Sequence, residues 1–367
     1  MSQCAPLCPH FGECGGCLYQ DKSYPEEQIG LKLNALQQLF NREVPITPSP
    51  EAYGYRNRMD FVCAFGKIGF RKRGTHNQVV EVEQCYLLPK RVAHLFQILK
   101  ETVREYGIPD FNYLNHQGYL RYITLRVACY SEDVMVSFVT ANDDPLLMPL
   151  VEAAKPYATS INWIVQSGLA DVNYGPVKTH FGQPYFVEKA GDKTYHAGPN
   201  TFAQNNAMLT RPLFDQIRDK VSGRTLDLYC GMGAISLYVA ERASEVLGVE
   251  LEGEAIRFAA ENQTLNRVQN IRFLAHDVRK WLIENEKKEW FETIILDPPR
   301  SGMSQKLCRK VLRMAPTRII YVSCNPKMLA EDMKAFEPAF TLDSLVAFDM
   351  FPQTPHVETV AVFSKKM

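Results

Sequence analysis

Long apolar runs are missing from this 367-residue sequence, and none approaches the roughly 18 residues that a membrane-spanning helix needs. The N-terminus also lacks the basic segment and apolar core of a secretory signal, so we expect a cytoplasmic protein without a membrane partner. Ten cysteines are too few for a disulfide-built scaffold, which a reducing compartment also disfavours. Cysteines that cluster in the sequence are therefore expected to bind a metal or to take part in chemistry.

An excess of charge of either sign is absent as well, because 41 Lys and Arg residues balance 41 Asp and Glu residues. The overall charge thus gives no support for a nucleic-acid partner. Locally, residues 56–73 contain six basic side chains and one acidic side chain, interleaved with aromatic residues. Such a segment can neutralise phosphates and stack on bases, although a solvated strand face with half-buried aromatic rings has the same composition.

The hydrophobic pattern changes near residue 200. Residues 26–40 have the apolar spacing of an amphipathic helix, and irregular strand-like and helical runs follow it. From residue 201 onward, helical and strand-like runs alternate, which predicts a parallel sheet flanked by helices. We therefore expect an irregular α+β region over residues 1–199 and an α/β domain over residues 200–367.

A turn rich in glycine follows the first strand of the predicted α/β domain, in Thr-Leu-Asp-Leu-Tyr-Cys-Gly-Met-Gly at residues 225–233. Glycines let the backbone approach a ligand, and Glu250 ends the next strand at the spacing from which a carboxylate reaches ribose hydroxyls. Asp277 follows the third strand. A dinucleotide motif would need a third glycine where Ser236 stands, so a nucleoside without pyrophosphate fits better, and S-adenosylmethionine is the obvious candidate.

Two later strand-like runs end in turns that contain proline, Leu-Asp-Pro-Pro-Arg at residues 296–300 and Val-Ser-Cys-Asn-Pro at residues 322–326. Ligands of open α/β sheets bind outside the carboxyl ends of the strands, so Cys324 should face the cofactor. On this segment alone, a buried structural thiol is the alternative.

Three cysteines near the start of the chain, Cys8, Cys14 and Cys17, have the spacing C-x5-C-x2-C, and Cys85 stands apart. Three close thiolates and a distant fourth can ligate either a [4Fe–4S] cluster or a tetrahedral zinc ion. The ligand types do not decide between the two metals.

These motifs, in this order, resemble the RNA 5-methyluridine (uracil-C5) methyltransferase family, in particular its iron–sulfur-containing 23S ribosomal RNA branch without the N-terminal RNA-binding barrel. Gly-Pro-Asn-Thr-Phe-Ala-Gln-Asn-Asn at residues 198–206 and Phe-Pro-Gln-Thr-Pro-His-Val-Glu-Thr at residues 351–359 belong to the resemblance, which spans nearly the whole chain. It implies a Rossmann-like S-adenosylmethionine-dependent methyltransferase domain preceded by an iron–sulfur and RNA-binding α+β region. It also implies a [4Fe–4S] cluster on the four cysteines, and cofactor contacts from these residues: Gln204, Tyr229, Glu250, Asp277 and Asp297.

The chemistry of uracil methylation asks for a nucleophilic thiolate that attacks C6 and a base that removes the proton from C5. The resemblance assigns the first role to Cys324 and the second to Glu358. Structural alternatives remain for the other residues: helix capping for Gln204 and Asp277, and strand packing for Tyr229. Glu358 has the alternative of a surface carboxylate on an edge strand.

By analogy with family members that carry the cysteine set, the expected substrate is ribosomal RNA, with transfer RNA as the alternative, and the expected state is a monomer. Candidates for holding the RNA backbone are Arg56, Arg58, residues 71–73, Arg121 and Arg126. An amino-group methyltransferase is a competing interpretation, but Arg300 stands where such an enzyme needs an aromatic residue. An RNA-binding iron–sulfur protein without activity is another, which the presence of both Cys324 and Glu358 disfavours.

Overall fold

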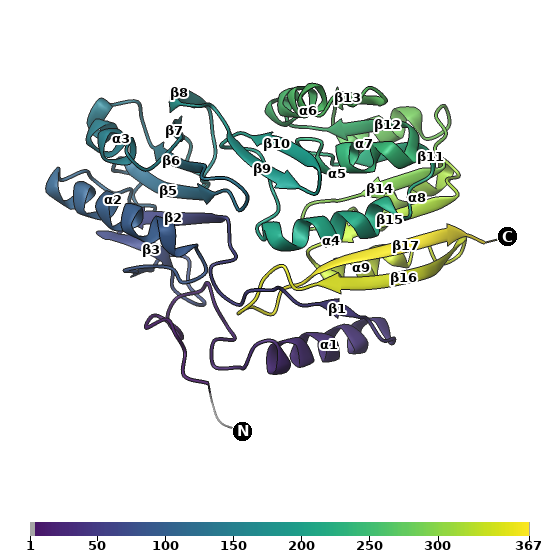
Figure 1. The fold of residues 1–367 in the computed structure, drawn as a ribbon, viewed down its shortest axis with the longest axis horizontal. Coiled ribbons are helices and arrows are strands. Elements are labelled where there is room, and N and C mark those ends of the chain that lie inside the picture. Colours follow the sequence, from purple (N-terminus) through teal and green to yellow (C-terminus); the bar gives the residue numbers. More distant parts are fainter. Residues whose placement is uncertain (1–3, 367) are drawn as a thin grey trace.

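The computed structural model describes residues 4–366, which form two large sheets side by side (Figure 1). The first sheet has the strand order β4-β3-β2-β5-β6-β7-β8. Its strands are β2 (Arg58–Ala64), β3 (Lys67–Arg71), β4 (Val79–Glu81), β5 (Leu120–Val127), β6 (Val134–Thr140), β7 (Ser160–Val165) and β8 (Val177–Gly182). Helices α2 (Ala93–Glu105) and α3 (Met148–Ala154) bury their apolar side chains against one face of this sheet.

The second sheet has the order β1-β16-β17-β15-β14-β11-β12-β13. Its strands are β1 (Ile46–Thr47), β11 (Gly223–Leu228), β12 (Ala243–Glu250), β13 (Ile271–Ala275), β14 (Thr293–Leu296), β15 (Arg318–Ser323), β16 (Phe340–Phe348) and β17 (Glu358–Lys365). The five strands from β15 to β13 run parallel, whereas β17 is antiparallel to both β15 and β16. A short hairpin of β9 (Phe186–Ala190) and β10 (Lys193–Ala197) lies between the two sheets in sequence.

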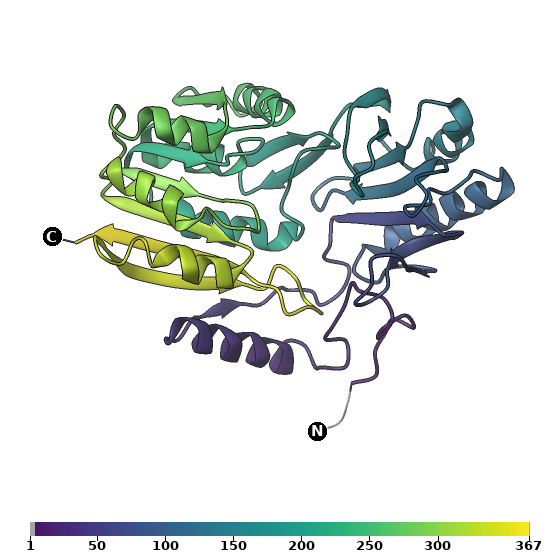
Figure 2. The same cartoon turned by 180° about the vertical axis from the view of Figure 1, so that it is seen from behind.

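Helices cover both faces of the second sheet. One face carries α4 (Ala207–Arg218), α5 (Ala234–Val239) and α6 (Gly253–Leu265), and the other carries α7 (Val278–Asn285), α8 (Gln305–Arg313) and α9 (Pro326–Met333). Figure 1 shows α4 in front of the sheet, and Figure 2 shows the green and yellow helices over the opposite face. Because both faces are covered, all four residues of β14 are buried, as the continuous apolar run predicts.

The predicted helix of residues 26–40 is confirmed as α1 (Glu26–Phe40), but its position was not predicted. The chain from α1 enters β1, which pairs in parallel with β16, and Leu36 and Val44 join the core beneath the second sheet. A segment of the N-terminal region therefore extends the α/β sheet, and the domain division after residue 199 stays a prediction. Within residues 4–366, no helix is both long and apolar enough to cross a membrane.

Candidate active site

The strand order of the second sheet reverses between β11 and β14, and ligands bind at such a point. The chain leaves β11 through a tight turn in which Tyr229, Gly231 and Gly233 all have positive φ angles. A side chain at Gly233 would meet the Phe273 ring, because a Cβ there lies 2.6 Å from a ring carbon. The glycine therefore allows the turn to pack tightly against the next strands and leaves its backbone open to a ligand.

The structure brings all seven predicted cofactor and catalytic residues to one cavity of about 550 Å³ at the carboxyl ends of the parallel strands. These residues are Gln204, Tyr229, Glu250, Asp277, Asp297, Cys324 and Glu358. Five of them end or follow a strand, Glu358 is the first residue of β17 and Gln204 lies in the loop before α4, so only the folded sheet assembles them. Phe202 and Arg300 also line the cavity, and neither was predicted as a site residue.

Two carboxylates in the lining of this cavity accept hydrogen bonds from backbone N–H groups. Glu250 is the last residue of β12, and its carboxylate accepts a hydrogen bond from the backbone N–H of Gly231 at 3.1 Å. Asp277 caps helix α7 by accepting a hydrogen bond from the backbone N–H of Lys280 at 2.8 Å. Asp277 therefore caps the helix and also lines the cavity. Its contact with adenine stays a prediction.

The reactive end of the cavity holds a thiol and two carboxyls in a desolvated setting. Burial, with a smaller contribution from the nearby Asp227, raises the pKa of Asp297 to about 7. Burial also raises the pKa of Glu358 well above its ordinary value, with a smaller effect from Asp297. The pKa of Cys324 is raised to about 11 by burial and by both carboxyls, whereas the Arg300 guanidinium lowers it. Glu358 is therefore a buried carboxyl beside a thiol, not an exposed edge-strand carboxylate.

Asp227, under the glycine turn, gives a test of these electrostatics. Its carboxylate accepts a hydrogen bond from the Ser236 hydroxyl at 2.5 Å, and burial raises its pKa from 3.8 to about 7. The folded protein thus binds this proton more tightly than the unfolded chain, and the resulting stability is lost as the pH rises toward 7. Compared with an Asp227→Asn variant, the wild type should lose up to ~1.4 kcal/mol of unfolding free energy per pH unit between about pH 4 and pH 7.

Denaturant unfolding of the wild type and the variant over that pH range measures the difference directly. Asp219→Asn is the matched control, because Asp219 is exposed on the surface. Parallel stability curves for the wild type and Asp227→Asn would contradict the raised pKa of Asp227.

Residues 198–206 form a loop whose backbone is held by buried side chains and whose Phe202 side chain is exposed. The guanidinium of the buried Arg126 donates to the backbone carbonyls of Gly198 and Thr201. The side-chain amide of Asn57 donates to the carbonyl of Gln204 at 2.8 Å. Phe202, between these anchors, is 60% exposed at the mouth of the cavity. An exposed ring on a fixed loop is suited to stacking on a flat ligand.

Two of the predicted RNA-binding arginines are buried, and the prediction is wrong for them. Arg121 and Arg126 both lie in β5, and their guanidinium groups bond to backbone carbonyls of neighbouring loops. They hold protein segments together and cannot reach RNA. The sequence did not reveal this because a strand buried along its whole length gives no alternating pattern around a charged residue.

The basic segment of residues 56–73 is divided between the core and the surface. Its aromatic residue Phe61 is fully buried, as are most residues of β2. Arg58 and Arg71 form ion pairs with Asp60 and Asp171, whereas Lys72 and Arg73 are exposed. The buried ring of Phe61 fits the structural interpretation, whereas the exposed basic side chains Lys67, Lys72 and Arg73 lie where they can meet phosphates.

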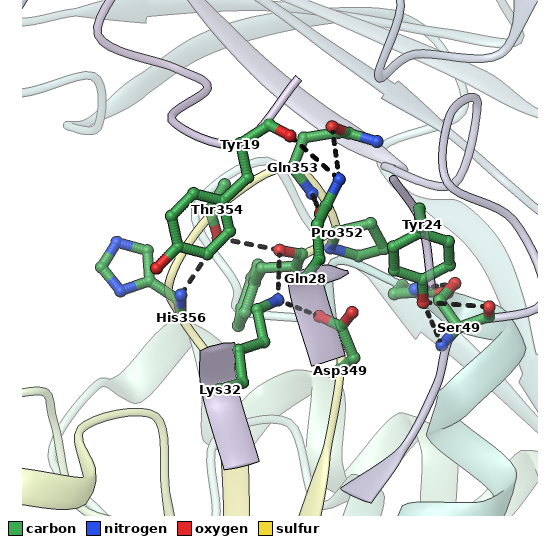
Figure 3. Close-up of polar contacts among 12 residues, drawn as sticks. Tyr19, Tyr24, Gln28, Lys32, Ser49, Asp349, Pro352, Gln353, Thr354 and His356 are labelled. Carbon is green, nitrogen blue, oxygen red and sulfur yellow. Dashed lines mark hydrogen bonds and ion pairs between the residues drawn. The ribbon is translucent and has the colours of Figure 1, made fainter. Parts of the chain in front are cut away.

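The loop before Glu358 is held by a buried polar cluster that joins it to helix α1 (Figure 3). Lys32 forms an ion pair with Asp349 at 2.5 Å, and their side chains are 1% and 0% exposed. The amide of Gln28 donates to the side chain of Gln353 at 3.0 Å and accepts from its backbone N–H at 2.8 Å. Buried polar groups with this many partners fix a backbone strongly, so the loop that enters β17 is rigid.

The four predicted metal-binding cysteines, Cys8, Cys14, Cys17 and Cys85, line a second cavity of about 200 Å³ beside the first sheet. Burial, with a smaller contribution from neighbouring thiols of the same group, raises the pKa of Cys17 to about 11 and that of Cys85 to about 12. Within residues 4–366, however, no three His, Cys, Asp or Glu side chains converge closely enough to hold a single metal ion.

A doubly wound sheet with a glycine turn at its switch point, an acid at the end of the second strand and a ligand-sized cavity defines an S-adenosylmethionine-dependent methyltransferase. The solved structure of Pyrococcus abyssi tRNA (uracil-54, C5)-methyltransferase in complex with S-adenosyl-L-homocysteine superposes with a TM-score of 0.81 at 33% identity, covering 95% of this chain and 86% of that one. The predicted α/β methyltransferase fold is thereby confirmed.

The family model described as tRNA (Uracil-5-)-methyltransferase matches residues 181–366. The tRNA (uracil(54)-C(5))-methyltransferase of Pyrococcus horikoshii is 36% identical over 355 residues, which cover 96% of this chain and 84% of the relative. An uncharacterized RNA methyltransferase of Thermotoga maritima is 33% identical and covers 98% and 84%. The chain belongs to the RNA uracil-C5 methyltransferase family and is an S-adenosylmethionine-dependent enzyme.

Proposed function

We propose that this enzyme methylates C5 of a uridine in RNA through a covalent bond between the sulfur of Cys324 and C6 of the base. One observation carries the proposal. The Cys324 thiol and the Glu358 carboxyl line the same cavity as the residues expected to bind the cofactor. A nucleophile, a base and the methyl donor are then within reach of one flat substrate.

Cys324, Glu358 and S-adenosylmethionine together supply the groups that the reaction needs. The Cys324 thiolate forms a bond to C6, and the electron pair of the C5–C6 double bond moves to C5. That carbon would take the methyl group that S-adenosylmethionine supplies when it is bound, and S-adenosylhomocysteine would leave with the electron pair of the broken sulfur–methyl bond. The Glu358 carboxylate then removes the proton from C5, the C5–C6 double bond re-forms, and Cys324 leaves as a thiolate.

The charges around Cys324 act in opposite directions, because the two carboxyls raise its pKa and Arg300 lowers it. Asp297 and Glu358 have raised pKa values and hold protons more readily than ordinary carboxyls, which reduces their repulsion of a thiolate. Arg300 also favours the thiolate because its guanidinium stabilises it. The raised pKa of Glu358 also makes its ionised form a stronger base toward the C5 proton.

A uracil base must leave its stack to enter the cavity, so the enzyme has to flip the nucleotide out of its helix or loop. Phe202 offers an exposed ring on which the flipped base can stack. Gln204 lies in the same loop and lines the same cavity, where its side-chain amide can hydrogen-bond a base edge or the cofactor.

Two classes of RNA are candidates for the substrate. The cysteine set favours 23S ribosomal RNA by analogy, whereas the Pyrococcus relatives at 33–36% identity are named as enzymes for uracil 54 of transfer RNA. Because these are similarities to proteins with a stated substrate, we place transfer RNA first and ribosomal RNA second.

Nucleoside mass spectrometry on unmodified transfer RNA and 23S ribosomal RNA transcripts separates the two. Incubation with the enzyme and S-adenosylmethionine should yield 5-methyluridine in the transfer RNA, and fragment analysis should place it at position 54. Methylation confined to ribosomal RNA would keep the reaction and overturn the choice of RNA. No 5-methyluridine in either transcript would contradict the proposed function.

We further propose that Cys8, Cys14, Cys17 and Cys85 hold a [4Fe–4S] cluster. Zinc needs its ligands about 2.3 Å from one ion, whereas four cysteines around a cluster are spread more widely. The four cysteines line one shared cavity of about 200 Å³, and the iron–sulfur branch of the family that the sequence resembles has this cysteine spacing. When bound, the cluster would join the N-terminal turn to the segment before α2, and methyl transfer assigns it no redox step.

Replacement of Cys17 by serine tests the cluster. The wild type purified without oxygen should contain about four iron and four sulfide per chain and absorb visible light, and Cys17→Ser should lose most of both. Cys129→Ser is the matched control, because Cys129 is exposed and outside the cavity. Zinc without iron in the wild type, or equal iron in Cys17→Ser, would contradict the assignment.

A further inference from the structure

A third cavity, of about 600 Å³, adjoins the cofactor cavity at Cys324 and Arg300, which line both. It lies between helix α1, the start of helix α9 and the loop that ends at Val357. Its volume is within the roughly 300–1,000 Å³ of pockets that hold ligands of nucleotide size. The remaining lining residues include Leu36, Gln38, Leu39, Lys327, Pro355 and His356.

The reacting base itself does not occupy this third cavity. Glu358 and the residues expected to bind the cofactor line the first cavity and are absent from the lining of the third. A uracil that is to meet both the methyl donor and the base must therefore enter the first cavity. The RNA strand continues beyond that nucleotide. The third cavity meets the first at Cys324 and Arg300, so it is the adjoining space for the next nucleotide of the strand.

The charges of the third cavity suit a phosphate. Arg300 and Lys327 supply cations at its wall, and in the described part of the chain no Asp or Glu side chain belongs to its lining. Lys32 also lines it, but its ammonium is already bound to Asp349 at 2.5 Å. Helix α9 begins beside Lys327, at Pro326, and its N-terminus adds a partial positive charge on the same side.

The uncharged surfaces of the cavity suit a base or sugar. The Nη2 atom of Arg300 lies 3.3 and 3.4 Å from the two ring nitrogens of His356, so the guanidinium and the ring are in contact at the boundary. Burial, and then Arg300, lower the pKa of His356, so its ring is neutral at pH 7. A neutral ring beside Leu39 and Pro355 offers a surface for stacking.

We propose that this cavity, the flanking-nucleotide groove, binds the nucleotide that adjoins the target uridine in the RNA strand. Arg300 and Lys327 hold its phosphate, and the His356 ring stacks with its base. The proposal rests on the proposed function, because it requires a target uridine in the first cavity. It makes helix α1 a part of the RNA-binding surface, although the basic segment of residues 56–73 contributes no side chain to the groove.

Two neighbouring glutamines on helix α1 provide a matched test. Gln38 lines the groove, whereas Gln37 is exposed on the same helix outside it. Gln38→Glu places a carboxylate where a phosphate should bind, and it should raise KM for whichever transcript the wild type methylates by about fivefold. Gln37→Glu adds the same charge to the same helix and should leave KM for the transcript unchanged. KM for S-adenosylmethionine should stay unchanged in both variants.

Lys327→Ala gives a second, independent readout. It should raise KM for RNA and lower the slope of log affinity against log salt by about one, as loss of one phosphate contact does. Lys334→Ala, at the other end of α9, is its control. Each phosphate near the target uridine can be replaced in turn by a neutral methylphosphonate. At one position the replacement should weaken binding to the wild type, but should not weaken binding to Lys327→Ala beyond the loss that the substitution itself causes.

The failures of the two proposals are distinguishable. A wild type that methylates neither transcript contradicts the proposed function. A wild type that methylates RNA, with Gln38→Glu equal to Gln37→Glu and Lys327→Ala equal to Lys334→Ala, overturns the groove. Thermal unfolding of each variant shows that a raised KM does not come from loss of the fold.

Discussion

Cys324→Ala is expected to abolish methyl transfer, lowering the rate by about 10⁴-fold or more, as loss of a covalent nucleophile does. The reason is that C5 of uracil is a poor nucleophile until a thiolate adds at C6. Binding of S-adenosylmethionine should change little, because the cofactor residues occupy other strands. Single-turnover methylation with tritiated cofactor, together with calorimetric binding of the cofactor, measures both quantities.

The control for this change is Cys129→Ala, which removes an exposed thiol from outside the cavity. It should retain wild-type activity. If Cys324→Ala kept its rate within tenfold of the wild type while folding normally, the covalent mechanism would be wrong.

Glu358→Gln should stop the reaction at a different point. Addition of the Cys324 thiolate and transfer of the methyl group do not use Glu358, so the variant should form the bond to C6 and add the methyl group, then fail to remove the C5 proton. Methylated RNA should therefore accumulate as a covalent complex with the protein, while the turnover rate falls by about 10²–10⁴-fold. Denaturing gel electrophoresis with radiolabelled RNA of ordinary sequence detects the complex.

The substitution should leave the fold intact, because the pKa of Glu358 is raised well above its ordinary value and a neutral amide has the same shape as the protonated acid. Glu337→Gln, at an exposed position, is the control and should turn over without accumulating a complex. Slow turnover of Glu358→Gln without any accumulated complex would move the role of base to another group.

Local patterns predicted much of the fold. The amphipathic spacing gave helix α1 with its observed bounds, and the alternation after residue 201 gave the parallel strands and their helices. Packing between distant segments was not predictable in the same way. The two-residue strand β1 and its pairing with β16 depend on contacts across 301 residues of chain, as between Ile46 and Ala347, which leave no local periodicity.

The site shows the same division. Tyr229, Asp297 and Cys324 follow strand ends, and the sheet geometry alone places such residues at one edge. Arg300 and Phe202 were missed because their significance lies in what surrounds them: a thiol beside the guanidinium, and a loop fixed by the buried Arg126 beneath the ring. The signal in the sequence that could have identified Phe202 is a single aromatic residue within a polar loop at residues 198–206.

The central claim is a covalent bond between Cys324 and the target uracil, and the most direct test uses RNA in which 5-fluorouridine replaces uridine. Fluorine at C5 cannot leave as a proton, so the reaction should stop as a stable protein–RNA complex that carries the transferred methyl group. Peptide mass spectrometry should then place the modified nucleotide on Cys324. A complex on another residue, or none from an enzyme that methylates ordinary RNA, would contradict the mechanism.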